Sequence, residues 1–358
     1  MTRRSLSAFA LPRPQQEPSA PCVVTIGGGH GQAALLRALT RLSCKITAVV
    51  SVADDGGCSG KLREELGMPP PGDIRRCLVA LASRSELARR FEARVAAESD
   101  APFGGVHRSV GNLVLAEMYR DLGGIQLAAD WAAALLGCVG RVVPAAESAG
   151  VLRVYDSEHG ALTGETCIGQ RTASPVVVNV EGPTHASPEA TSAIMNADLL
   201  LLGPGSFAGS TLAALMTGDL VRAVVATRGR RVLVNNLSRE PHASYGIEQH
   251  ERILRDHIVI KSGGDSALID AMSHTPLGHR ADDRSDGSVA YASCVARPGE
   301  HTHDETLLAA ALSQHFGLLS IGSRPTPEVD ANALALFEEA LTAATGRLGQ
   351  VSATVSSR

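Results

Sequence analysis

The stretch CVVTIGGGHGQAALLRAL, from Cys22 to Leu39, decides the fold. Its opening, CVVTI (22–26), is short, apolar and rich in β-branched residues, which predicts a strand. A glycine cluster follows, and then QAALLRALTRL (32–42) carries leucines at helical spacing. Strand, tight loop and helix in this order form the unit from which α/β folds are built.

Later apolar runs repeat this unit. KITAVVSV (45–52) is continuous and apolar, as expected of a parallel strand buried on both faces. Further candidate strands, each near a helical or glycine-rich segment, are VVPA (142–145), PVVVNV (175–180), ADLLLLG (197–203) and RRVLVNN (230–236). Strands that alternate with helices over this length predict an α/β fold with a doubly wound, mostly parallel sheet and flanking helices.

The remaining segments define the expected domain limits. We expect a charged helix, RSELARRFEARVAAES (84–99), an exposed loop, HRADDRSDGS (279–288), and a helix over DETLLAAALSQHFG (304–317). A last helix is expected at 326–348, because the segment begins after a proline and ends near a glycine. Residues 1–20 and 349–358 are then expected to be disordered tails around a single domain over 21–325.

Composition narrows the class of protein. With 358 residues and 44% hydrophobic residues, the chain can bury a large core. Its net charge of −4 gives no electrostatic drive towards a nucleic acid polymer. Seven scattered cysteines without CxxC pairs indicate a reducing compartment, and we expect a cytoplasmic protein. No apolar run approaches the roughly 20 residues that span a bilayer, so no membrane insertion is expected.

The first glycine loop is a candidate diphosphate site. Gly29-x-Gly31-x-x-Ala34 satisfies the dinucleotide fingerprint, in which small residues let backbone N–H groups approach a diphosphate. The partial positive charge of the following helix N-terminus removes the need for a lysine. A tight strand-to-helix turn without a ligand explains the same pattern, and the pattern alone does not decide between them.

VADDGGCSG (52–60) lies at the carboxyl end of the second predicted strand, the sheet edge where ligands gather. Asp54 and Asp55 should therefore stand beside the first glycine loop. Two adjacent carboxylates normally need a cation, a hydroxyl donor or a basic side chain. Lys61, Arg63 and Arg75 are available as basic partners. A turn capped by an aspartate or by Ser59 is the alternative.

Two more loops have suitable chemistry. Three prolines in LGMPPPGDIRRCLVALA (66–82) stiffen a loop before a helix, for which Asp73 is the expected N-cap. ADLLLLGPGSFAGSTLAALM (197–216) is a second strand, glycine loop and helix, in which Ser206 could donate a hydrogen bond to a phosphate. Two such loops on one sheet edge favour a ligand that contains a diphosphate.

Two further groups rank lower. Asn112 begins a helix and either faces the site or caps a turn. His301 and His303 have the density of a metal cluster, but histidines beside a hydrophilic loop are usually solvated, and no metal is assigned there.

Five blocks together resemble a known family. In chain order they are VVTIGGGHGQAALLRAL, ITAVVSVADDGGCSGKLREELGMPPPGDIRRCLVALA, SVGNLVLAEMY, GRVVPA and ADLLLLGPGSFAGS. They are similar to the YvcK proteins, or gluconeogenesis factors, in the superfamily of CofD-type 2-phospho-L-lactate transferases. The similarity covers roughly residues 22–240, and the DDGGxSG and PPPGDIR blocks are its most specific parts.

The resemblance implies a Rossmann-like nucleotide-binding domain over 21–325. YvcK-type members imply a regulatory protein that binds UDP-sugars such as UDP-N-acetylglucosamine and links gluconeogenic growth to cell-wall synthesis and cell shape. Such a protein is a homo-oligomer, acts with cell-wall synthesis proteins as partners and requires no cofactor for binding. The nucleotide and phosphate site carried over by motif comprises Gly28, Gly29, His30, Gly31, Asp54, Asp55, Ser59, Arg63, Asp73, Asn112, Gly203, Gly205 and Ser206.

CofD-type members imply the alternative function. Such an enzyme transfers a phospho-acid group from a nucleoside diphospho-acid to an acceptor hydroxyl with Mg²⁺, and Asp54 and Asp55 would then hold the metal and be catalytic. Aromatic residues make up only 3% of the chain, which offers little for a flat deazaflavin acceptor. An NAD-dependent oxidoreductase rests on the Gly29-x-Gly31-x-x-Ala34 pattern alone.

His30 is one departure from the family pattern, since it stands where YvcK-like sequences usually have threonine.

Overall fold

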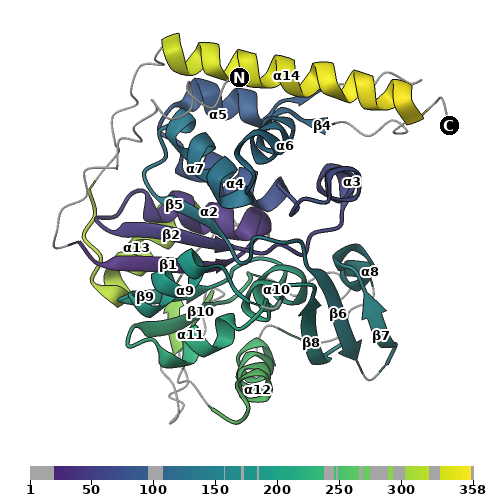
Figure 1. Ribbon diagram of the computed structural model, residues 1–358. Coiled ribbons are helices and arrows are strands. Elements are labelled where there is room, and N and C mark those ends of the chain that lie inside the picture. The colour runs from purple at the N-terminus through teal and green to yellow at the C-terminus, as the bar shows by residue number, and fades with distance from the viewer. Residues whose placement is uncertain are drawn as a thin grey trace.

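A seven-stranded parallel sheet forms the centre of the computed structural model (Figure 1). The structure describes residues 20–95, 108–156, 158–170, 173–183, 185–237, 246, 249–265, 269–274, 289–292, 303–321 and 331–355. The strands are β1 (Cys22–Gly27), β2 (Lys45–Val50), β5 (Arg141–Pro144), β9 (Leu199–Leu202), β10 (Arg230–Val234), β11 (Asp270–His274) and β12 (Val289–Ala292).

The strand order is β12-β11-β10-β9-β1-β2-β5, with every neighbouring pair parallel. Numbered from β1 within this sheet and taken from the β5 edge, the order is 3-2-1-4-5-6 with a seventh strand added, which is the order of dinucleotide-binding doubly wound folds. The order reverses between β1 and β9. The predicted α/β, Rossmann-like sheet with flanking helices is therefore confirmed.

Helices cover both faces of the sheet because its strands are apolar on both sides. In β9, Leu199 and Leu201 pack into one core, whereas Leu200 and Leu202 pack into the other. The first core contains α2 (Gly29–Leu39), α4 (Gly72–Leu81), α7 (Ile125–Leu136) and α13 (Glu305–Phe316). The second contains α9 (Pro188–Met195), α10 (Ala213–Leu215), α11 (Leu220–Ala226) and α12 (His250–Ser262).

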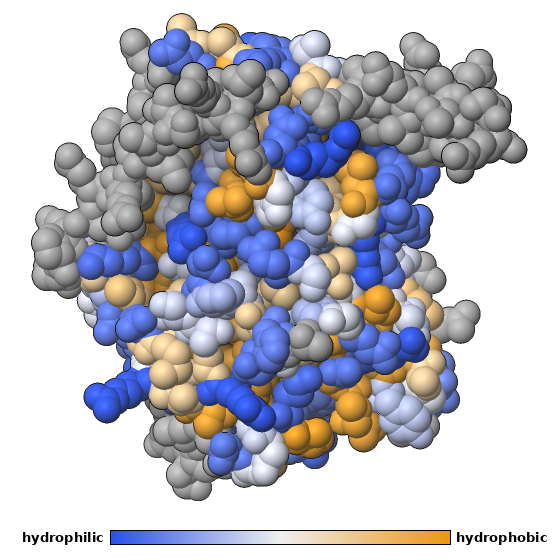
Figure 2. All heavy atoms as spheres, viewed as in Figure 1, coloured by the Kyte–Doolittle hydropathy of each residue, from blue (hydrophilic) through white to orange (hydrophobic). Residues whose placement is uncertain are grey.

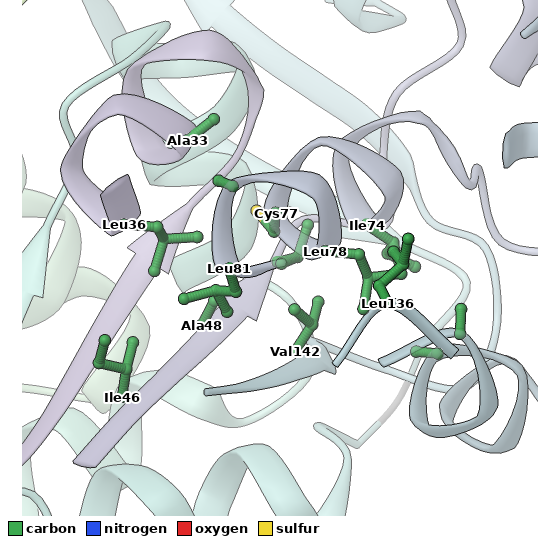
Figure 3. Packing of buried hydrophobic residues seen from close by; sticks show 14 of the residues in the cluster. Ala33, Leu36, Ile46, Ala48, Ile74, Cys77, Leu78, Leu81, Leu136 and Val142 are labelled. Atoms are coloured by element: carbon green, nitrogen blue, oxygen red, sulfur yellow. The ribbon is translucent and has the colours of Figure 1, made fainter. Parts of the chain in front are cut away.

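Figure 3 shows how tightly the first core joins helix to strand. Leu78 and Leu81 of α4 point towards Ala48 of β2 and Val142 of β5, beside Leu136 of α7. This packing fixes the start of α4 relative to the carboxyl ends of the strands. An outer layer on the same side comprises α3 (Gly57–Leu66), α5 (Ser85–Glu92), α6 (Val110–Leu122) and α14 (Ala331–Val355).

A second, antiparallel sheet was not predicted from the sequence. Its strands are β6 (Val151–Asp156), β7 (Gly160–Thr163) and β8 (Pro175–Glu181), in the order β7-β6-β8. The run PVVVNV, expected in the parallel sheet, forms β8 here, and that expectation is wrong. Val178 and Val180 are buried while Val177 is exposed, the one-sided alternation of an antiparallel sheet that the unbroken valine run conceals. A short helix, α8 (Glu165–Gln170), follows β7.

Two helix boundaries differ from the predicted ones. The helix expected over 84–99 ends at Glu92, because Arg94 and Val95 form β3, which pairs with β4 (Arg108–Ser109); residues 96–107 lie outside the described part. The last helix, expected at 326–348, is α14, which continues through 349–355 of the expected tail. Glycine inside a helix costs only about 1 kcal/mol relative to alanine, so Gly349 does not end it.

Of the other predicted segments, one is confirmed and the others lie outside the residues that the structure describes. The helix predicted over 304–317 is confirmed as α13, with Asp304 accepting hydrogen bonds from the N–H groups of Thr306 and Leu307. The expected loop at 279–288, His301 and residues 1–19 of the expected N-terminal tail lie outside the described residues. The division into one domain over 21–325 with flanking tails stays a prediction.

No single helix in the described part of the chain is long and apolar enough to span a membrane, and only the bent pair Phe207–Leu215 with Leu220–Ala226 meets that test jointly. Figure 2 shows hydrophobic side chains in separate patches among hydrophilic ones on this face of the molecule. Single apolar side chains on a surface are ordinary and mark no site by themselves.

Candidate functional site

The two predicted glycine loops meet at the point where the strand order reverses. β1 and β9 are neighbours, with Ile26 paired to Leu202, so both loops leave the sheet side by side. A Cβ atom on Gly31 would lie 2.5 Å from the Pro204 carbonyl oxygen and 2.6 Å from the Gly205 nitrogen. Only glycine therefore lets the loops approach this closely. In doubly wound sheets, this crevice is where ligands bind.

The second loop has a shape that its own contacts fix. Gly203 has φ +76° and Gly205 has φ +140°, conformations that favour glycine. The Asn236 side chain accepts a hydrogen bond from the Gly205 N–H at 2.9 Å and donates one to the Gly205 carbonyl oxygen at 2.8 Å. Asn236 is the second residue after β10, and this position near the carboxyl end of a strand is the signal that could have identified it.

Ser206 is the N-cap of the next helix. Its hydroxyl oxygen accepts a hydrogen bond from the Gly209 N–H at 3.2 Å, at the start of the π-helix η1 (Phe207–Leu212). Wide turns of this kind often occur at functional sites. The Ser206 hydroxyl hydrogen remains able to donate to a ligand oxygen.

Asp73 lies against the first glycine loop. The sequence suggested that Asp73 is the N-cap of α4, and that expectation is wrong. Pro71 is the N-cap, and Asp73 is the second residue of the helix. A Cβ atom on Gly28 would lie 2.3 Å from the Asp73 Oδ2 atom, and the Gly29 N–H donates to the Asp73 carboxylate. A carboxylate of the protein itself thus lies where α2 begins. Burial raises the pKa of Asp73, whereas the Arg76 guanidinium, 2.6 Å from its Oδ1 atom, opposes that rise.

The adjacent Asp54 and Asp55 make different contacts. Asp54 Oδ1 accepts a hydrogen bond from the Gly56 N–H at 2.8 Å. Asp55 Oδ1 accepts two hydrogen bonds from Thr166 of α8, from its N–H at 2.9 Å and its hydroxyl at 2.8 Å. Asp55 thereby ties the antiparallel sheet and α8 to the edge of the parallel sheet. Part of its hydrogen-bonding capacity is already used within the protein.

Ser59 and Asp54 both lie at the start of α4. A Cβ atom on Gly72 would lie 2.2 Å from the Ser59 hydroxyl oxygen and 3.3 Å from the Asp54 Oδ2 atom. Arg63 lies six residues after the first residue of α3, about 9 Å along the helix at 1.5 Å per residue. Its backbone carbonyl accepts the N–H of the C-capping Gly67. The structure therefore brings Ser59 to the carboxylates and places Arg63 further out.

Glu165, which was not predicted from the sequence, is a further carboxyl group at this edge of the sheet. It is the first residue of α8 and shares a hydrogen bond with Asp54. A Cβ atom on Gly209 would lie 2.8 Å from its Oε1 atom, so Glu165 spans the space between the Asp54 loop and the second glycine loop. Burial, and then the negative charge of Asp54, raises the pKa of Glu165 to about 9. Asp54 and Glu165 therefore hold a proton between them at neutral pH.

Four carboxyl groups consequently gather at this edge, from Asp54, Asp55, Asp73 and Glu165. Carboxylate oxygens are ligands that Mg²⁺ accepts. Nevertheless, the residues that the structure describes include no group of three acidic, histidine or cysteine side chains arranged to hold a metal ion. As arranged, these carboxyl groups do not form a metal site.

His30 and Asn112 lie on the cationic side of the same edge. Partial burial of its ring, and then the positive charges of Arg76 and Arg75, lower the pKa of His30. The Asn112 side-chain oxygen accepts a hydrogen bond from Arg75 Nε at 3.1 Å. Arg75 thus pairs with Asn112 of α6, with no ion pair to Asp54 or Asp55 among the described residues.

Comparison with known proteins agrees with this architecture. The family described as 2-phospho-L-lactate transferase CofD matches residues 23–293. A putative gluconeogenesis factor of Mycobacterium leprae is 36% identical over 82% of this chain and 86% of its own length. The gluconeogenesis factor of Bacillus subtilis is 34% identical over 66% of this chain and 75% of its own length.

A solved structure gives the same result at the level of the fold. The crystal structure of a Bacillus halodurans protein, described as a member of the UPF0052 family, superposes with a TM-score of 0.72 at 27% identity. The match covers 83% of this chain and 99% of that protein. The chain therefore belongs to the CofD family, with relatives named gluconeogenesis factors over most of its length.

Proposed function

We propose that the protein binds a nucleoside diphosphate sugar, of the UDP-N-acetylglucosamine type, at the edge of the sheet between β1 and β9. One observation carries the proposal: two glycine loops pack against each other where the strand order reverses, with Gly31 in contact with the backbone of Pro204 and Gly205. In doubly wound folds this position suits a diphosphate, because the helix N-termini and backbone N–H groups of such loops commonly bind phosphate oxygens.

The carboxyl groups beside the loops suit the sugar. Carboxylate oxygens accept charge-assisted hydrogen bonds from hydroxyl groups, and Asp54 lies beside the start of α4, which also places Asp73 against the first glycine loop. Glu165, which shares a hydrogen bond with Asp54, extends this set of carboxyl oxygens towards the second glycine loop. A polyol, whose hydroxyl groups donate hydrogen bonds, matches these acceptors better than an apolar ligand would.

The names of the relatives support a regulatory role connected with carbon metabolism. In our proposal, the occupied protein links gluconeogenic growth to cell-wall synthesis and cell shape. It acts in the cytoplasm as a homo-oligomer and signals to proteins of cell-wall synthesis. Binding itself needs no cofactor.

A thermal-shift panel tests the proposal. UDP-N-acetylglucosamine, other UDP-sugars, GDP and NAD are each added to the full chain. A ligand at 100 times its Kd should stabilise the folded state by about 2.7 kcal/mol. We expect UDP-sugars to raise Tm more than GDP or NAD does. The absence of a shift with every UDP-sugar would contradict the proposal.

A CofD-like transferase is the second candidate, favoured by the family description and by the gathered carboxyl groups. The reaction would move a phospho-acid group to an acceptor hydroxyl with Mg²⁺. Because the described carboxyl groups are not arranged for a metal, we derive no step through it. Asp54→Asn separates the two functions: a transferase loses turnover and its response to Mg²⁺, whereas a binding protein loses ligand affinity alone.

A further inference from the structure

Arg75 is a buried cation without a carboxylate partner in the described part of the chain. Its relative exposure is 8%, and its one hydrogen bond there runs from Nε to the neutral side-chain oxygen of Asn112. The neighbouring Arg76 is neutralised by Asp73. The negative charge of Glu92 offsets part of the cost of burying the Arg75 guanidinium, but Glu92 forms no ion pair with it in the described part of the chain. Buried guanidinium groups usually have an anionic partner within hydrogen-bonding distance.

The N-terminus of α6 also favours an anionic partner. Ser109 occupies the N-cap position, but its hydroxyl donates to the Phe91 carbonyl oxygen at 3.2 Å and makes no capping bond. The Val110 N–H donates to the Ala93 carbonyl oxygen at 2.9 Å, so the partial positive charge of this 13-residue helix is left to the N–H groups of Gly111 and Asn112. Arg75 lies directly beside this first turn, because a Cβ atom on Gly111 would come within 2.8 Å of Arg75 Cδ.

Both features lie next to the proposed nucleotide site. Arg75 and Arg76 lie close enough to the first glycine loop to lower the pKa of His30, although burial of the ring contributes more. Asp54 and Ser59 contact the start of α4 at Gly72, three residues before Arg75 and on the same face of the helix. The edge therefore runs from the carboxyl groups of Asp54 and Glu165 to the cation of Arg75, about one helical turn further along α4.

We propose that Arg75 and the N-terminus of α6 bind a phosphate group of the ligand, with Asn112 holding the guanidinium in place. This inference rests on the proposed nucleotide site and adds its polarity: phosphate lies towards α6, and the sugar hydroxyls lie towards Asp54 and Glu165. The guanidinium keeps two outer nitrogens for a forked contact with phosphate oxygens.

The test compares Arg75→Met with the surface control Arg153→Gln, which breaks an exposed ion pair to Glu181 on the antiparallel sheet. Calorimetric titrations of the full chain use pyrophosphate, uridine, UDP and UDP-N-acetylglucosamine at fixed ionic strength. Arg75→Met should weaken binding of pyrophosphate and both nucleotides about 10- to 100-fold, the range for a lost charge-assisted hydrogen bond. Uridine binding, and all binding by the control, should not change.

Ligand-free stability separates a binding role from a structural one. Methionine keeps the stem that packs on Gly111 but removes the buried charge, so Tm of Arg75→Met should equal or exceed that of the wild type. A marked fall in Tm together with unchanged UDP affinity would show a structural role and overturn the inference. If Arg75→Met does not fold, Arg75→Lys replaces it; the lysine should still weaken UDP binding, since it lacks the fork.

The ligands also distinguish the two proposals. If UDP binds the wild type and the Arg75 variants equally, the inference fails while the proposed function stands. If pyrophosphate binds in an Arg75-dependent manner but no nucleotide binds, the phosphate site stands and the proposed function fails. If the wild type binds neither pyrophosphate nor UDP, both are overturned.

Discussion

Gly31→Ala should separate the two glycine loops. The added Cβ atom would lie 2.5 Å from the Pro204 carbonyl oxygen, 2.6 Å from the Gly205 nitrogen and 2.6 Å from the Pro204 carbonyl carbon. All three are backbone atoms, so no side chain can turn aside to relieve the overlap. The second loop is also held from its other side by Asn236, so it cannot move without losing those hydrogen bonds.

The expected cost follows from two opposing effects. Overpacking by one methyl group in a close-packed region costs typically about 1–3 kcal/mol. Against this, alanine is favoured over glycine in a helix by up to about 1 kcal/mol, and Gly31 lies in α2. We therefore expect a net loss of about 1–2 kcal/mol in the free energy of unfolding, together with weaker binding of UDP-sugars.

Gly169→Ala is the matched control, since Gly169 lies in α8 and its added Cβ atom would meet no heavy atom within 4 Å. It should gain up to about 1 kcal/mol from helix propensity. Because the gain in helix propensity is common to both variants, denaturant unfolding should separate them by the packing cost alone, about 1–3 kcal/mol. Equal stabilities and equal UDP-sugar affinities would refute the close approach of the loops as the reason for glycine at position 31.

Three further predictions concern residues at the same edge of the parallel sheet. Thr166→Val removes the hydroxyl donor to Asp55 and should cost about 1 kcal/mol in denaturant unfolding, whereas Thr166→Ser should not. Asn236→Ala removes two hydrogen bonds to Gly205; we expect a loss of about 2 kcal/mol and weaker ligand binding by calorimetry. Glu165 ionises near 4.5 when unfolded but at about 9 when folded, so its contribution to stability is full below pH 4.5 and is lost as pH rises through 9. The free energy of unfolding should therefore vary less with pH over this range in Glu165→Gln than in the wild type.

Those parts of the structure that depend on short sequence patterns could be predicted from the sequence. The five residues of CVVTI and the four leucines of β9 specify buried strands by composition alone, and their glycine loops follow directly. Because parallel strands end at one edge, the loops at Gly29 and Gly205 could be placed together without coordinates. The prediction depends on topology rather than on any contact.

The remaining part of the site depends on contacts between distant segments. Thr166 bonds to Asp55 across 111 residues, and Arg75 bonds to Asn112 across 37. The antiparallel sheet that brings Glu165 to the edge contains a valine run whose pattern also suits a parallel strand. Periodicity specifies which residues are buried, but not which distant segment buries them, so Glu165 could not be found in this way.

Asp54 and Asp55 make different contacts, and this difference bears on which function this edge of the sheet supports. Asp55 holds α8 through Thr166, and α8 in turn holds Glu165 against Asp54. A metal that recruited both aspartates would compete with Thr166 and displace the proton shared near Asp54, and would therefore loosen α8. A sugar that only adds hydroxyl donors leaves these bonds in place. The arrangement of these residues thus favours a ligand that joins the existing hydrogen bonds over a cation that must replace them.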